Sequence, residues 1–144
     1  MIIEVLYVLG LVSVATLVGS MVFFSGVMAP LIFIKLEQVT AGQFVRSVFP
    51  WYYLVIAGLS AIGALSLGIV HPFSSALLAV IGIAALVARQ VLMPSINVHR
   101  DKLMGGDPGA GEVFQRLHSL SVWINGGQVI GAISVLIMLG LTKF

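Results

Sequence analysis

The sequence contains no cysteine and very few charged residues. Without cysteine, disulfide bonds, thiolate metal sites and cysteine nucleophiles are excluded, although the compartment is left open. Charged residues make up only 8% of the 144 residues and hydrophobic residues 60%, whereas a soluble domain carries about 25% charged residues. The mean hydropathy of +1.16 and the shortage of charge indicate an integral membrane protein. The chain also lacks a basic cluster interleaved with aromatic residues, which excludes a nucleic-acid interface.

Four apolar runs are each long enough to cross a bilayer, which takes about 20 residues in an α-helix. They cover residues 5–34, 49–70, 73–96 and 117–141. Backbone groups in lipid must be satisfied within their own segment, so each run is predicted to be a helix. The predicted fold is therefore all-α, a polytopic integral membrane protein. Residues 1–144 form a single domain, a bundle of four transmembrane helices.

The three connections predict different local structures. The sequence TAGQ at Thr40–Gln43 fits a capping box, so we expect a short interfacial helix there, with a bend at Pro50 before the second span. Residues 71–72 leave so short a connection that the second and third spans should form an antiparallel hairpin. The third connection is rich in Gly and Pro, which predicts a turn. Beyond it, Glu112 and Arg116 have the spacing of a helical ion pair, so the fourth helix should begin before the membrane does.

Basic residues in the connections predict the orientation of the chain. The first and third connections carry Lys or Arg, and the second has none. By the positive-inside rule, the connections 35–48 and 97–116 face the cytoplasm of an inner or plasma membrane, and both termini face outward. The aromatic run Trp51, Tyr52 and Tyr53 then lies at the cytoplasmic end of the second span. We expect all three to be interfacial anchors.

Polar residues of the fourth span share one helix face. His118, Ser121, Asn125 and Gln128 advance by three, four and three residues, and such steps stay on one side of a helix with 3.6 residues per turn. Polar side chains are costly in lipid, so this face should point into the bundle.

The third span carries an unusual charge at Arg89, which shares a helix face with Arg100. Arg89 precedes Asn97 by eight residues, which places it about 12 Å deeper along the helix. A charge in hydrocarbon costs at least a few kcal/mol unless it is paired or reaches water. None of the four predicted spans contains an acidic residue that could pair with it.

Two interpretations of Arg89 remain open. In the first, it snorkels toward the cytoplasmic face and binds carbonyls, water or lipid phosphate. In the second, it belongs to a pocket of positive potential in the cytoplasmic half of the bundle. That pocket would bind an anion such as a lipid headgroup, a carboxylated amphiphile or the propionates of a haem. The candidate ligand-binding residues are Arg46, Arg89, Asn97, Arg100, His118, Ser121, Asn125 and Gln128.

Two histidines near the cytoplasmic boundary are candidate metal ligands. His99 and His118 could each bind a metal or a haem through a neutral imidazole. Without cysteine or an intramembrane carboxylate, the pair makes a poor closed metal site. His118 could instead be a single axial haem ligand, a proton donor to a bound substrate, or a hydrogen-bonding residue at the membrane surface.

Several motifs together resemble a known family. The segments FFSGVMAPLIF, AGQFVRSVFPWYYL, LMPSINVHR and FQRLHSLSVWIN resemble the TMEM205-like family of small four-helix membrane proteins, long classed as a domain of unknown function. The layout is also similar to that of anthrone-oxygenase-like membrane proteins. The first resemblance covers nearly the whole chain and implies a four-helix membrane protein without a settled activity. The second implies a redox or oxygen-using site near Arg89, Asn97, Arg100, His118 and Asn125.

Two functional hypotheses follow from these patterns. The first is a binding or enzymatic site for an anionic amphiphile or a haem- or metal-type cofactor, with redox or oxygenase-like chemistry as one form of it. The alternative is a non-catalytic accessory subunit or scaffold. It would associate with a membrane-protein partner or a second copy through the small residues of the second span, which are Ala57, Ala61, Ala64 and Gly68. In both, the lipid bilayer is the surrounding solvent.

Overall fold

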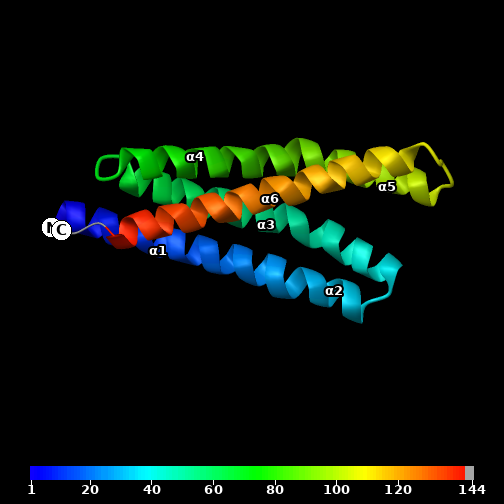
Figure 1. Ribbon diagram of the computed structural model, residues 1–144, viewed down its shortest axis with the longest axis horizontal. Helices are drawn as coiled ribbons and strands as arrows, with labels where there is room; N and C mark the ends of the chain where they lie inside the picture. The colour runs from blue at the N-terminus through cyan, green and yellow to red at the C-terminus, as the bar shows by residue number, and fades with distance from the viewer. Residues whose placement is uncertain (142–144) are drawn as a thin grey trace.

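The computed structural model describes residues 1–141, and in that range the chain is built of helices joined by short turns (Figure 1). Four continuous helical segments are long and apolar enough to cross a membrane. The all-α fold with four spans is therefore confirmed. The first span consists of α1 (Ile2–Phe23), the π-helical turn η1 (Phe24–Met28) and α2 (Ala29–Lys35), and the second span is α3 (Gln38–Leu67). The third span consists of α4 (Pro72–Val87), the π-helical turn η2 (Ala88–Leu92) and α5 (Met93–Met104), and the fourth is α6 (Ala110–Leu141).

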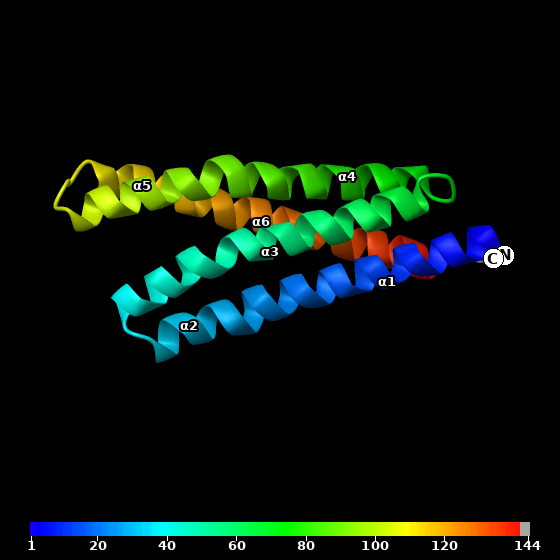
Figure 2. The ribbon, with the colours of Figure 1, turned by 180° about the vertical axis from the view of Figure 1, so that it is seen from behind.

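The helices form one antiparallel bundle that opens at one end. The predicted α3–α4 hairpin is present, α1 packs on α3, and α6 contacts α1, α4 and α5. The start of α1, the end of α6 and the α3–α4 turn lie at one end of the bundle, and the α2–α3 and α5–α6 turns lie at the other (Figures 1 and 2). At this second end, α2 and the beginning of α3 diverge from α5 and α6 in both views. The divergence leaves space between the two helical pairs.

Each π-helical turn precedes a proline. η1 ends two residues before Pro30, and η2 ends two residues before Pro94. Proline has no N–H for the helical ladder and its ring crowds the preceding turn, and a π-turn is a common local adjustment within a helix. The first and third spans therefore continue through their prolines as single rods.

The predicted interfacial helix and its capping box are wrong. α3 is one continuous helix from Gln38 to Leu67, with Pro50 inside it. Its N-cap is Glu37, and no side chain bonds to the free amides there, so Thr40 already lies within the first turn. Pro50 removes only one backbone donor from the ladder, which a helix of 30 residues tolerates.

Helix α6 begins well before its apolar run, as expected. It starts at Ala110, and Arg116 Nη2 donates to Glu112 Oε1 at 2.5 Å within its first turns. The helices α3 and α5 also extend beyond the predicted spans into the polar zone. A hydropathy profile detects only the apolar stretch of a helix that lies in the membrane. The hydrogen-bonded helix itself continues into the polar zone until a turn ends it.

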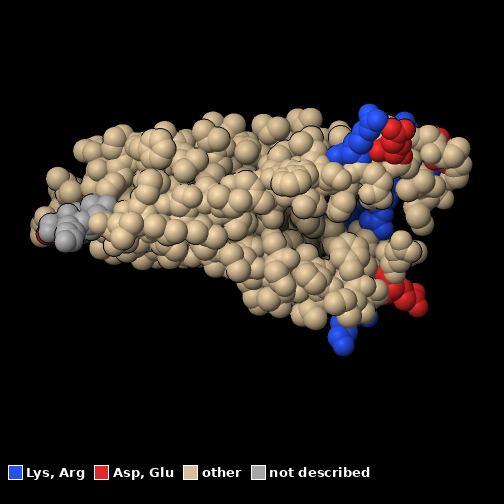
Figure 3. Space-filling view, in the orientation of Figure 1, with Lys and Arg blue, Asp and Glu red and all other residues tan. Residues whose placement is uncertain are grey.

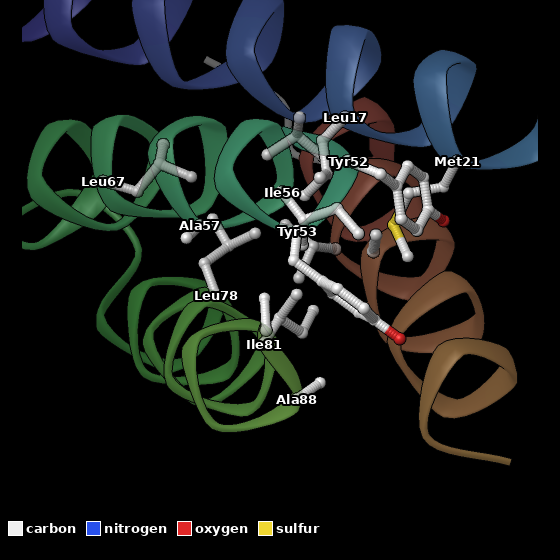
Figure 4. Close-up of a cluster of buried hydrophobic side chains, with 14 of the residues drawn as sticks. Leu17, Met21, Tyr52, Tyr53, Ile56, Ala57, Leu67, Leu78, Ile81 and Ala88 are labelled. Carbon is white, nitrogen blue, oxygen red and sulfur yellow. The ribbon is translucent and has the colours of Figure 1, made fainter. Parts of the chain in front are cut away.

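The core of the bundle is a set of interlocking apolar side chains from several helices. The cluster includes Leu17 and Met21 of α1, Tyr53, Ile56 and Leu67 of α3, and Leu78, Ile81 and Ala88 of the third span (Figure 4). Many large apolar side chains are exposed on the outside. Such a surface belongs in hydrocarbon, which identifies the chain as an integral membrane protein.

The orientation in the membrane stays a prediction, and its charge pattern is visible in the structure. Lys and Arg gather at the end formed by the α2–α3 and α5–α6 turns (Figure 3). We expect this end to face the cytoplasm. The chain has no cysteine, so Pro72→Cys and Gly109→Cys, both at exposed positions, can be labelled individually. In intact cells a membrane-impermeant maleimide should label Pro72→Cys at once, and Gly109→Cys only after permeabilisation. The reverse order would invert the assignment.

Candidate functional site

A cavity of about 710 Å³ lies in the open end of the bundle. All four spans contribute to its wall, because this is where α2 and α3 diverge from α5 and α6 (Figure 3). Much of the wall is aromatic. The rings come from Phe24, Phe33, Phe49, Tyr52, Tyr53 and Phe114.

Arg100 provides an unpaired positive charge at the cavity. Its guanidinium lies directly over Gly42 of α3, where an added Cβ would be only 1.4 Å from Nη2 and 2.0 Å from Cζ. Glycine is thus the residue that lets this cation lie against the first turns of α3. Within residues 1–141, Arg100 makes no salt bridge or side-chain hydrogen bond. Its charge remains available to a ligand.

The neighbouring Arg46 is already paired. Its Nη1 lies 2.8 Å from Asp101 Oδ1, which links α3 to α5. The two side chains are 47% and 58% exposed, so the pair adds little stability. Its electrostatic effect is to neutralise Arg46, which leaves Arg100 as the uncompensated cation beside the cavity.

A hydrogen-bonded cluster joins three spans deeper in the wall. The Tyr52 hydroxyl donates to Asn125 Oδ1 at 2.7 Å, and Asn125 Nδ2 donates to Ser25 Oγ at 2.9 Å. Ser25 belongs to η1, Tyr52 to α3 and Asn125 to α6. The ring of Phe24 stacks on that of Tyr52, with centroids 4.4 Å apart. The two hydrogen bonds and the ring stacking fix the positions of the Tyr52 and Asn125 side chains in this part of the cavity wall.

Tyr53 lies in the same wall with its hydroxyl unused. The side chain is fully buried, and its hydroxyl has no hydrogen-bond partner among the described residues. The ring extends from α3 into the space between the third span and α6 (Figure 4). Tyr52 is also buried, whereas Trp51 is 71% exposed. The prediction of an interfacial anchor therefore fails for both tyrosines.

The cavity brings together most of the candidate residues predicted from the sequence. These are Arg46, Asn97, Arg100, His118, Ser121 and Asn125. The ring of His118 lies nearly parallel to that of Phe114, with centroids 5.9 Å apart and an angle of 10°. The Ser121 hydroxyl donates to the His118 carbonyl at 2.7 Å. The imidazole of His118 therefore lies at the cavity wall against the ring of Phe114, one turn earlier on α6.

Three other candidates lie away from this wall. Arg89 Nε donates to the carbonyl of Pro50 at 3.2 Å, a contact of the kind expected if Arg89 binds backbone carbonyls. Gln128 is buried and its Nε2 donates to the carbonyl of Ile81 at 3.0 Å, which ties α6 to α4. His99 Nδ1 lies 2.8 Å from the carbonyl of Ser95 in its own helix.

A family model for a domain of unknown function (DUF4149) matches residues 12–103. The chain belongs to the DUF4149 family. No curated protein and no solved structure matches it. The DUF4149 match extends from α1 through most of α5, so it contains Ser25, Gly42, Tyr52, Tyr53 and Arg100.

The α6 part of the site lies outside the DUF4149 match. His118, Ser121 and Asn125 follow residue 103. Within the described residues of this DUF4149 chain, no group of three or more His, Asp or Glu side chains is placed to hold a metal ion. Among the described residues, the cavity brings together the unpaired guanidinium of Arg100, several aromatic rings and a polar cluster.

Proposed function

We propose that the cavity binds a single-chain anionic amphiphile taken from the cytoplasmic leaflet. The anionic headgroup pairs with Arg100, and the chain lies along the aromatic wall. The observation that carries this proposal is the unpaired guanidinium of Arg100 against Gly42, beside a largely apolar cavity with six aromatic rings in its wall.

Electrostatics favour an anion at this position. The Arg100 guanidinium packs on the first turns of α3, where free backbone amides and the helix dipole add positive potential. A partly buried charge is costly unless it is paired. A guanidinium presents a planar fork of donors that fits a carboxylate or a phosphate.

The size and lining of the cavity favour an apolar chain. Its volume of about 710 Å³ lies within the range of about 300–1,000 Å³ typical of small-molecule sites. Along α6, the lining residues run from Phe114 to Asn125, which corresponds to about 16 Å at 1.5 Å per residue. A chain of that length would cover the rings of Phe24, Phe49 and Tyr52.

A haem or metal cofactor with redox function is the second candidate. The anthrone-oxygenase-like resemblance favours it, and His118 at the cavity wall is the residue that could act as a single axial ligand. His99 would contribute less, because its Nδ1 already meets the Ser95 carbonyl. A Soret band in the absorption spectrum of the purified protein would replace the amphiphile proposal by this one.

The experiment compares three ligands that share one chain. Stearate, stearyl phosphate and stearyl alcohol are titrated into the detergent-purified protein, and binding is measured by native mass spectrometry. We expect at least one anion to bind about tenfold or more tighter than the alcohol, because a hydrogen bond to a charged group contributes about 1.5–3 kcal/mol. The order of stearate and stearyl phosphate then identifies the headgroup as carboxylate or phosphate.

Equal affinity for all three ligands would contradict an anion site at Arg100. Binding of none of them, with loss of assembly when Ala61 on the exposed face of α3 is replaced by leucine, would favour the accessory-subunit alternative. In that case the cavity would have a structural role only.

A further inference from the structure

The inner wall of the cavity holds hydrogen-bond donors that nothing in the described chain uses. Tyr53 is fully buried and its hydroxyl has no partner in residues 1–141. An unpaired buried polar group costs about 1–3 kcal/mol, so native proteins keep few of them. The hydroxyl is closed off from the cavity in this structure, so a ligand oxygen reaches it only when neighbouring side chains move apart. Such a partner would then remove this cost.

The neighbouring cluster leaves a second donor unused. A side-chain amide carries two N–H donors and one carbonyl acceptor. In Asn125 the acceptor takes the Tyr52 hydroxyl proton, and Nδ2 donates one hydrogen to Ser25 Oγ. The second hydrogen of Nδ2 has no partner among the described residues. The amide hydrogen can only be donated, and the Tyr53 hydroxyl can donate as well as accept. An acceptor on the ligand is therefore the one group that suits both.

The distance between the two ends of the site limits where that acceptor lies on the ligand. Gly42, which marks the position of the Arg100 guanidinium, and Tyr53 are both on α3, eleven residues apart. This separation is about 16 Å along the helix. Side chains on a helix lean toward its N-terminus, which brings the Tyr53 hydroxyl back toward Gly42 and shortens the gap to roughly 10 Å.

We propose that the natural ligand carries an uncharged hydrogen-bond acceptor, of the ketone or ester carbonyl class, near the middle of its chain. The anionic headgroup pairs with Arg100, and the mid-chain carbonyl accepts hydrogen bonds from Tyr53 and Asn125. This inference rests on the proposed amphiphile function and specifies its substrate class: an acid or phosphate whose chain is oxygenated part-way along. A saturated chain fills the same cavity but leaves both donors unpaired.

The test varies the position of one ketone along a constant chain. Stearate is compared with three oxo-stearates that have the ketone near the carboxylate, at mid-chain or near the methyl end. We expect the mid-chain ketone to bind about five- to thirtyfold tighter than stearate, the ratio expected for one or two neutral hydrogen bonds of about 1 kcal/mol each. The other two oxo-stearates should show no such gain.

The variant Tyr53→Phe removes one donor and keeps the ring. Because the hydroxyl it removes is buried and unpaired, the variant should fold, and a small gain in thermal stability is expected. In this variant the mid-chain preference should fall about fivefold, any remainder coming from Asn125. Tyr7→Phe is the matched control, because the Tyr7 hydroxyl donates to the Leu139 carbonyl at the other end of the bundle. It should keep the full preference.

The outcomes separate this inference from the proposed function. If stearate and stearyl phosphate both fail to bind, the amphiphile site and this inference fall together. If stearate binds and Arg100→Gln weakens it, but the mid-chain ketone brings no gain, only this inference is wrong. A gain that persists unchanged in Tyr53→Phe would also overturn it, because the donor would then lie elsewhere.

Discussion

Replacing Arg100 by glutamine is expected to weaken stearate binding about 10- to 100-fold, because the one unpaired cation that lines the cavity within residues 1–141 is lost. The glutamine keeps a polar, hydrogen-bonding side chain, although a shorter one, and it cannot neutralise a carboxylate. Native mass spectrometry with the stearate titration measures the change. Stearyl alcohol should bind the variant and the wild type alike.

Arg116→Gln is the matched control for this charge. Arg116 pairs with Glu112 on the outside of α6, and the two side chains are 79% and 74% exposed. It does not line the cavity, so its loss should change stearate affinity by less than about twofold, as expected for a screened surface charge. If Arg100→Gln and Arg116→Gln lowered stearate affinity equally, the affinity would depend on the net charge of the protein and not on the position of Arg100.

Gly42→Ala tests the same interaction without removing the cation. The new Cβ would occupy the space of the Arg100 guanidinium, only 1.4 Å from Nη2. The guanidinium is the far end of a flexible side chain, so it should move aside at little cost in stability, and stearate binding should fall about tenfold. Gly58→Ala on the same helix meets no atom within 4 Å and should leave binding unchanged. Full affinity in Gly42→Ala would show that the position of Arg100 over α3 is unimportant.

Gly10→Ala is expected to destabilise the bundle by about 1–3 kcal/mol, the usual cost of overpacking a tight interior. An added Cβ would lie 2.6 Å from both Cγ and Cδ2 of Leu67, which is fully buried between α1 and α3. Because Leu67 is fully buried and its Cγ is not the far end of a flexible side chain, either its packing or the spacing of the two helices must change. Unfolding by sodium dodecyl sulfate in mixed micelles measures the loss.

Gly19→Ala on the same helix is the control for this substitution. Its added Cβ meets no atom within 4 Å, and alanine is the better helix former by about 1 kcal/mol in water. We expect Gly19→Ala to be as stable as the wild type or slightly more so. If Gly10→Ala unfolds at the same detergent fraction as Gly19→Ala, the close packing of α1 on α3 does not contribute to stability.

The fold could be predicted from the sequence because hydrocarbon permits few alternatives. Four apolar runs separated by polar turns must become four helices, since their backbone groups have no other partners in lipid. The helix ends could not be predicted as well. The TAGQ pattern at Thr40 fits a capping box, yet α3 begins earlier, at Gln38. A short sequence pattern does not show where the preceding turn ends, and the end of that turn decides which residue becomes the N-cap of the helix.

The candidate site could be predicted only on the helices whose polar residues stand out. Polar residues on α6 and α5 are rare enough to mark a face, and His118, Asn125, Asn97 and Arg100 do line the cavity. Ser25 and the two tyrosines were missed, because serine and tyrosine are ordinary in membrane helices. One signal was present: Tyr53, Ser60 and Leu67 recur every seven residues of α3, and all three are fully buried.

The number of spans, the helical class and the concentration of basic residues at one end follow from the amino-acid sequence alone, because each depends on composition along a single segment. The packing of the helices was needed to show that Arg100 lies over Gly42, that Arg46 pairs with Asp101 and that Tyr52, Asn125 and Ser25 meet. These contacts join residues up to 100 positions apart. They depend on how far α2 and α3 diverge from α5 and α6, and that divergence results from side-chain packing between helices rather than from the periodicity of any one helix.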